Sequence, residues 1–261
     1  MKRIIIICFA ALMGFNANAQ FALWHYGIIG GPSSTWLINS NASGMGQDLN
    51  YTSSMGGTIG LSLTRNFVEK VGIRIDLLYS MHNQKYNGTV GDTSFFSSTY
   101  SYNTETKLTY FDIPIMLHLG KSNGFFFEVG PQFGFLLGAK EDFTITPAGS
   151  SPSVVESNAN YKSDFNSMNI AAVLGFGYNF SVVGLLSIDL GIRLGYGLTD
   201  VTKTFPETDW DPPIGMDAVP HSLTSTAANF NSLNTIQSNY SYTKTNRVFG
   251  SFLIGATMQI P

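Results

Sequence analysis

The sequence is poor in cysteine, in charge and in long apolar runs. Cys8 is its only cysteine among 261 residues, and charged residues make up 12% of the chain. A soluble domain carries about twice that share of charge, about 25%. The formal net charge of −3 leaves no broad basic surface, so we expect no nucleic-acid partner. Beyond the N-terminal segment no stretch approaches the ~20 apolar residues of a membrane-spanning helix. Passage through a membrane would therefore require a closed barrel.

The N-terminal segment has the features of a signal peptide. Two basic residues, a short apolar run and a small-x-small cleavage pattern follow one another: Lys2-Arg3, Ile4–Met13 and Ala17-Asn18-Ala19. We predict a signal peptide over residues 1–19 and one barrel domain over residues 20–261; the alternative for the first segment is a buried strand or an anchor helix. Cleavage would also remove Cys8, which excludes disulfides, thiolate catalysis and cysteine metal sites from the mature chain.

Apolar and polar residues alternate without a break over Leu186–Leu198. A period of two residues predicts a strand, and its length reaches the ~9–11 residues of a tilted membrane strand. Seven other stretches share the pattern, although the phase of the glycine-rich first one is unclear. The predicted strands are His25–Thr35, Met55–Thr64, Val71–His82, Tyr110–Leu119, Phe125–Leu137, Asn169–Asn179, Leu186–Leu198 and Arg247–Ile260. The expected fold is an all-β, antiparallel up-and-down transmembrane β-barrel of about eight strands.

The connections alternate strictly between short and long. Membrane barrels have short periplasmic turns and longer extracellular loops, so both chain ends should lie in the periplasm. The three short connections are Asn66–Lys70, Gly120–Gly124 and Asn179–Val183. The four long polar segments, predicted to be extracellular loops, are Leu37–Ser54, Asn83–Thr106, Ala139–Ser167 and Thr199–Thr245.

Alternation alone does not say which face of the barrel points outward. A soluble lipocalin-like barrel would place the apolar face inside. The polar face here consists mostly of Gly, Ser and Thr, with few of the Lys and Glu residues of a solvated surface. Small residues suit the interior of a narrow barrel, and Tyr79, Tyr178 and Tyr196 lie where an aromatic girdle is expected. We therefore predict that the apolar face contacts lipid, in the outer membrane of a Gram-negative bacterium.

The predicted lumen then contains charges of both signs. Charges in a narrow interior must be paired or hydrogen-bonded. We predict a structural network that plugs the lumen, in preference to a conducting or catalytic role. By height, Arg74 could meet Asp76, Asp112 or Glu128; the stagger of the strands leaves the choice open. The predicted network comprises Arg74, Asp76, Asp112, Glu128, Asp189, Arg193 and Arg247.

The stretch Tyr110-Phe111-Asp112-Ile113-Pro114-Ile115-Met116-Leu117 resembles a middle strand of the PorT-like outer-membrane β-barrel family of Bacteroidetes. The glycine-rich opening strand and the closing segment Phe249–Ile260 are also similar to that family. The resemblance covers essentially the whole mature chain and implies an OmpA-like barrel of about eight strands. One member takes part in a secretion system linked to gliding motility. The end Met258-Gln259-Ile260-Pro261 departs from many outer-membrane proteins because it lacks a terminal aromatic residue.

Few side chains suggest chemistry. Ser80 and His82 lie near an outer strand end, where some lipid-modifying barrels carry a Ser–His pair, but both face the predicted lumen and no acid evidently orients the imidazole. His118, near the opposite rim, is interpreted as a satisfied lumen residue. The last long loop has clustered carboxylates whose spacing does not match an EF-hand, which favours a solvated acidic loop over a calcium site: Asp200, Glu207, Asp209, Asp211 and Asp217. We predict no catalytic residue, cofactor or metal.

These patterns favour a structural or interaction protein whose rigid barrel holds variable loops in position. Its expected partners are outer-membrane lipid and, through the loops, envelope or surface proteins. Three alternatives stay open: an accessory component of a secretion or motility system, suggested by the resemblance alone; a lipid-modifying enzyme; and a small-solute channel.

Overall fold

The computed structural model describes residues 24–39, 50–52, 54–91, 99–121, 123–147, 149, 153–203 and 244–260. The predicted signal peptide over residues 1–19 lies outside this part. No helix in the described ranges is long and apolar enough to cross a membrane. The elements are β1 (Trp24–Ile38), β2 (Asn50–Thr52), β3 (Met55–Val68), β4 (Val71–Gly91), β5 (Thr99–Gly120), β6 (Gly124–Pro147), β7 (Ser153–Asn160), the short 3-10 helix η4 (Lys162–Asp164), β8 (Met168–Val183), β9 (Leu186–Gly197) and β10 (Asn246–Ile260).

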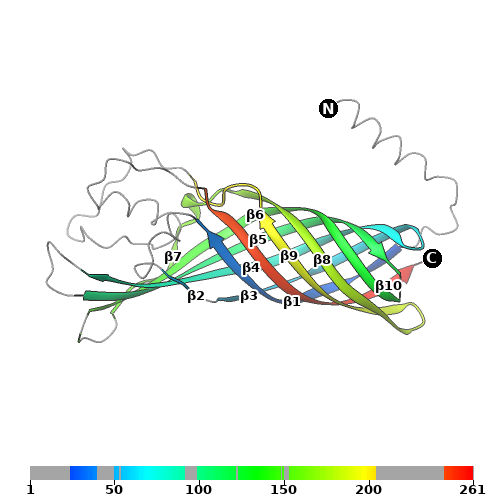
Figure 1. The fold of residues 1–261 in the computed structure, drawn as a ribbon, viewed down its shortest axis with the longest axis horizontal. Coiled ribbons are helices and arrows are strands. Elements are labelled where there is room, and N and C mark those ends of the chain that lie inside the picture. Colours follow the sequence, from blue (N-terminus) through cyan, green and yellow to red (C-terminus); the bar gives the residue numbers. More distant parts are fainter. Residues whose placement is uncertain are drawn as a thin grey trace, which may run out of the picture.

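Eight of the strands close an antiparallel barrel (Figure 1). Following the ring, β1, β3, β4, β5, β6, β8, β9 and β10 each pair with the next, and β10 pairs with β1. The two extra strands lie outside the ring, β2 against β4 and β7 against β6. Neighbours in the ring follow one another along the chain, apart from these additions. The prediction of an up-and-down barrel of about eight strands is confirmed.

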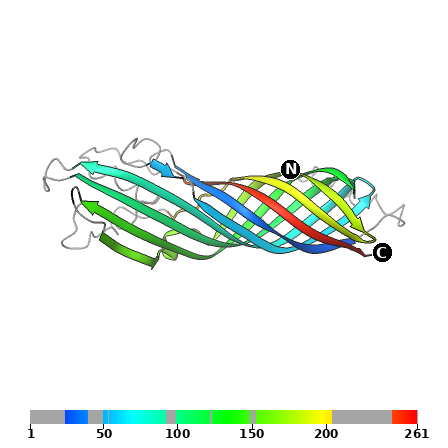
Figure 2. The same cartoon turned by 90° about the horizontal axis from the view of Figure 1, so that it is seen from below.

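Three strands run well beyond the barrel. β4, β5 and β6 are 21, 22 and 24 residues long, and Figure 2 shows their far ends projecting past the ring. We call residues 83–91, 99–107 and 138–147 of these strands the sheet extension. The loop predictions Asn83–Thr106 and Ala139–Ser167 were wrong over these residues, because polar residues continue the hydrogen-bonded ladder here without an apolar alternation to mark it.

The short connections lie at the opposite end. The predicted turn Asn179–Val183 was wrong in position, since β8 continues to Val183 and the chain reverses at Gly184. Gly184 has a φ of +58°, in the left-handed region that glycine adopts without a steric penalty. The apolar run therefore extends to the turn itself.

Burial alternates along each barrel strand, with the apolar side chains outside. On β9, Ile192 is 53% exposed and its neighbour Arg193 only 5%. The outward aromatic residues include Tyr79 and Tyr196, while Tyr178 packs edge-on against Phe125. The outward-facing apolar positions of the eight barrel strands, from the short turns up to the sheet extension, are called the lipid belt below.

Two phenylalanine rings fill lumen space that glycines leave open. A Cβ on Gly195 would lie 2.1 Å from the Phe249 ring, and one on Gly177 would lie 2.3 Å from the Phe126 ring. A larger residue at either glycine would overlap an aromatic ring in a closely packed interior. The glycine-rich polar face therefore makes room for aromatic packing, besides lining a narrow bore.

Candidate functional site: the charged lumen

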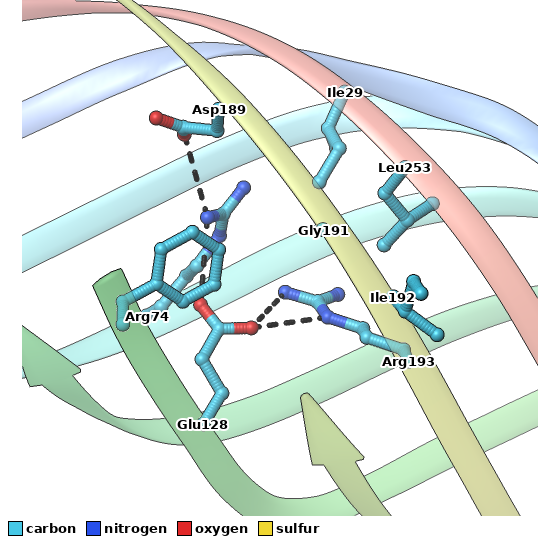
Figure 3. A pocket seen from close by; sticks show the side chains of 9 residues that line it. Ile29, Arg74, Glu128, Asp189, Gly191, Ile192, Arg193 and Leu253 are labelled. Carbon is cyan, nitrogen blue, oxygen red and sulfur yellow. Dashed lines mark hydrogen bonds and ion pairs between the residues drawn. The ribbon is translucent and has the colours of Figure 1, made fainter. Parts of the chain in front are cut away.

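Arg74 is the hub of a buried charge cluster inside the barrel (Figure 3). Its Nε lies 3.0 Å from Oδ1 of Asp76 on the same strand, β4. Its Nη1 lies 3.4 Å from Oε1 of Glu128 on β6 and 3.5 Å from Oδ2 of Asp189 on β9. The three carboxylates thus approach one guanidinium from three strands.

Arg193 completes the same cluster from β9. Its Nη1 donates to Oδ2 of Asp76 over 2.6 Å, and its Nη2 and Nε donate to Oε2 of Glu128 over 2.8 and 3.1 Å. His118 Nδ1 lies 3.1 Å from the other Glu128 oxygen. We call Arg74, Asp76, Glu128, Asp189 and Arg193 the central cluster. Charge-assisted bonds of this kind compensate for the loss of water around buried charges.

A second group lies closer to the sheet extension. Asp112 Oδ1 accepts a hydrogen bond from Arg247 Nη2 over 3.3 Å, and its Oδ2 lies 3.1 Å from His82 Nε2. His82 Nδ1 lies 2.8 Å from the Thr35 hydroxyl. The Arg247 guanidinium also stands 4.4 Å above the Tyr110 ring, a cation–π contact.

The seven predicted lumen charges are all buried and fall into these two groups. Of the three partners considered for Arg74, Asp76 and Glu128 contact it, whereas Asp112 belongs to the second group. The stagger between β4 and β5 decides this, because Arg74 lies opposite Met116 and not opposite Asp112.

Sequence reasoning missed the acid that orients His82. Thr35, His82 and Asp112 form a hydroxyl–imidazole–carboxylate series, in which the hydroxyl comes from β1 and not from Ser80. Ser80 instead shares a hydrogen bond with the Thr58 hydroxyl, over 3.0 Å. The three members of the series are at most 3% exposed, so a lipid substrate does not reach them. Placing Asp112 beside His82 required the β4–β5 register, which the sequence does not display.

Two small cavities adjoin the central cluster. One of about 10 Å³ is lined by Arg74, Glu128, Asp189 and Arg193 together with apolar side chains. The other, of about 30 Å³, lies towards the short-turn end, beside His25 and His118. A single water needs roughly 10–15 Å³ by this measure. These cavities therefore have room for a water or two, and not for a solute.

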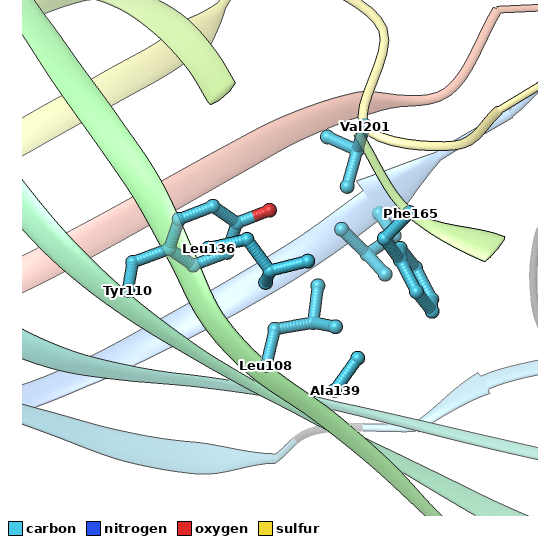
Figure 4. Packing of buried hydrophobic residues seen from close by; sticks show 7 residues of the cluster. Leu108, Tyr110, Leu136, Ala139, Phe165 and Val201 are labelled. Atoms are coloured by element: carbon cyan, nitrogen blue, oxygen red, sulfur yellow. The ribbon is translucent and has the colours of Figure 1, made fainter. Parts of the chain in front are cut away.

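A buried apolar cluster (Figure 4) adjoins the second charge group through Tyr110, whose ring contacts Arg247. Phe165 and Val201 reach it from the segments that precede β8 and follow β9. The backbone N–H of Asn166 donates to the Val201 carbonyl, and the backbone N–H of Lys203 donates to the Asp164 carbonyl, both over 2.8 Å. These two hydrogen bonds tie the two segments together. The outer apolar cluster consists of Leu37, Leu108, Tyr110, Leu136, Ala139, Phe165 and Val201.

The predicted acidic loop is described only at its first member. Asp200 Oδ1 accepts hydrogen bonds from the backbone amides of Thr202 and Thr245, over 3.1 and 3.0 Å. The other carboxylates of that loop lie within residues 204–243, outside the described part. Within the ranges that are described, no group of three or more His, Cys, Asp or Glu side chains could hold a metal ion.

The model of a known protein family, described as an outer membrane protein beta-barrel domain, matches residues 16–203. The chain belongs to this family. As a member of the outer membrane β-barrel domain family, it lies in the outer membrane and turns its lipid belt to hydrocarbon. The soluble-barrel alternative was therefore wrong, and the predicted location is confirmed.

Solved structures of other outer-membrane barrels are similar to this family member at low identity. Neisserial surface protein A is 10% identical, with 91% of this chain and 97% of that chain covered and a TM-score of 0.36. OprG from Pseudomonas aeruginosa is 11% identical, with 92% and 97% covered and a TM-score of 0.32. The protease OmpT from Escherichia coli is 8% identical, with 92% and 98% covered and a TM-score of 0.31. No curated protein matches the chain.

Proposed function

We propose that this chain is a non-conducting outer-membrane barrel of structural or interaction type. The observation that carries the proposal is the set of buried charged and apolar side chains inside the barrel. The central cluster, the Asp112 group and the outer apolar cluster follow one another along the bore. The cavities beside the central cluster have room for a water or two. In this proposal the buried charges close the barrel and stiffen it, and they perform no chemistry.

The sheet extension is the part proposed to contact other molecules. Its outer face is polar, with Lys85 lying 3.7 Å from Glu105, and with Lys107 paired to Asp142. The hydrogen bond from Lys107, with a second from the backbone amide of Asn158, lowers the pKa of the Asp142 carboxyl. Ladder hydrogen bonds across β4, β5 and β6 hold these side chains on a rigid sheet. Since the short turns lie at the other end, we assign the extension to the outside of the cell, facing envelope or surface proteins.

The proposal includes the absence of catalysis. The arrangement nearest to a catalytic series, Thr35–His82–Asp112, is buried inside the barrel. A triad acts on a substrate only when its nucleophile can reach the reacting atom. Lipid A mass spectrometry of cells with and without the protein tests this part; a mass change that depends on the protein would contradict it.

Within the family, we propose that the chain is a PorT-like barrel of Bacteroidetes. The stretch Tyr110–Leu117 supports this, and it lies in β5 with Tyr110, Asp112 and Met116 turned into the lumen. On this resemblance, an accessory role in a secretion or motility system is the second candidate function. Mild crosslinking followed by co-purification separates the two: recovery of secretion components favours the accessory role, and their absence favours an independent surface barrel.

We expect the refolded chain to give no steady conductance steps in planar lipid bilayers. The physical reason is that the buried ion pairs and the outer apolar cluster occupy the bore, which eight strands leave barely wide enough for side chains. An open porin inserted in the same membrane serves as the positive control. Reproducible steps from the folded, heat-modifiable form of the chain would contradict the closed lumen.

A further inference from the structure

Arg65 is a charged residue among the apolar side chains of the lipid belt. It faces outward on β3, in line with Ile59, Leu61 and Leu63, which are all well exposed. On the outward positions of the eight described barrel strands below the sheet extension, no other Lys, Arg, Asp or Glu occurs. A charged side chain facing lipid is unfavourable, although less so towards the membrane surface. Arg65 lies near the short-turn end of β3, where that surface is expected.

Two aromatic rings hold the Arg65 guanidinium. Its central carbon lies 5.0 Å from the centroid of the Trp24 ring and 5.8 Å from that of Phe67. Trp24 stands directly opposite Arg65 in the β1–β3 register. Stacking on an aromatic face orients the planar group and leaves its edge N–H donors free to bind.

No carboxylate pairs with this guanidinium among the described residues. The acid closest to it in the sequence, Glu69, lies 3.9 Å from Lys121 instead. The turns that carry Lys70 and Lys121 are joined, because the Gly120 amide donates to the Lys70 carbonyl over 2.9 Å. Among the described side chains of these turns, the rim around Arg65 therefore carries an excess of positive charge, with three basic side chains and one acidic one.

We propose that Arg65 binds the phosphate of an anionic phospholipid at the short-turn end of the barrel. A lipid phosphate supplies the anion that the described part of the protein does not provide at this depth. Guanidinium and phosphate match in a two-pronged hydrogen-bonded geometry. Trp24 suits the site in a second way, since tryptophan rings prefer the membrane–water interface. The stacked pair thus forms a preoriented headgroup site, and Lys70 and Lys121 favour a lipid with a net negative charge.

Native mass spectrometry of the full chain from mixed micelles tests the site. The micelles contain equal amounts of phosphatidylglycerol and phosphatidylcholine. We expect the wild type to retain more phosphatidylglycerol than phosphatidylcholine. Arg65→Gln should retain about tenfold less phosphatidylglycerol, because losing one hydrogen bond between charged groups weakens binding by about that factor. Equal retention by the wild type and Arg65→Gln, or no preference between the two lipids in the wild type, would overturn the proposal.

Two further variants separate binding from general charge. Lys140→Gln removes a cation from the sheet extension at the other end, and it should retain phosphatidylglycerol like the wild type. Arg65→Lys keeps the charge without the planar group and should give intermediate retention. The heat-modified gel shift checks that each variant is folded. If Arg65→Gln does not fold, a salt titration of the wild type decides: retention must fall with ionic strength, and a salt-independent preference counts against the site.

Discussion

Glu128→Gln is expected to lower the free energy of unfolding by about 3–5 kcal/mol, the usual cost of breaking a buried ion pair by removing one partner. Glu128 accepts from both Arg74 and Arg193 and also contacts His118. The neutral amide would leave two buried guanidinium groups with too little negative charge. Urea titration of the chain in lipid vesicles, followed by tryptophan fluorescence and by the heat-modified gel shift, measures the change.

The matched control is Glu105→Gln in the sheet extension. Glu105 pairs with Lys85 over 3.7 Å, and both side chains are partly exposed. An exposed pair contributes about 0–1 kcal/mol, so this variant should unfold almost like the wild type. If Glu128→Gln changed the free energy of unfolding as little as Glu105→Gln, the central cluster would not stabilise the barrel, and its charges would serve another purpose.

Ile192→Arg is expected to destabilise the barrel in the membrane by about 2–4 kcal/mol, the cost of an arginine on the lipid face near the midplane. Ile192 faces outward near the middle of β9, between Phe176 on β8 and Phe252 on β10. The same urea titration in vesicles gives the free energy, and the folded fraction after refolding into vesicles gives a second readout.

Thr144→Arg serves as the control for this substitution. Thr144 lies on β6 in the sheet extension, beyond the lipid belt, opposite Asn103 of β5. An arginine there meets water and should change the free energy of unfolding by less than about 0.5 kcal/mol, as for an ordinary surface substitution. A neutral effect of Ile192→Arg would mean that this face does not meet hydrocarbon.

The barrel itself could be predicted because a two-residue period is visible in one strand at a time. Leu186–Leu198 was predicted as a strand, and β9 covers Leu186–Gly197. The sheet extension could not be found in this way. Residues such as Thr104 and Thr106 continue β5 through backbone pairing. The outward-facing residues that alternate with them do not contact lipid, so they need not be apolar.

For the lumen, the sequence likewise predicts which face of a strand each charge occupies, but not which charges are in contact. Alternation alone placed Arg74, Arg193 and their carboxylates on one face of their strands. Which of them meet depends on stagger, and a shift of two residues between β4 and β5 would exchange the neighbours of Arg74. The contact of His82 with Asp112 was missed for that reason.

The most direct test of the outward orientation is contact between acyl chains and methyl groups, measured by nuclear Overhauser effects on methyl-labelled protein in lipid or detergent. Methyl groups of Ile192, Leu194 and Ile254 should receive magnetisation from the acyl chains. Those of Ile29, Leu78 and Leu253, which are buried together in the lumen, should not. Acyl-chain contacts to the lumen set, with water contacts to the outward set, would contradict this structure of the barrel.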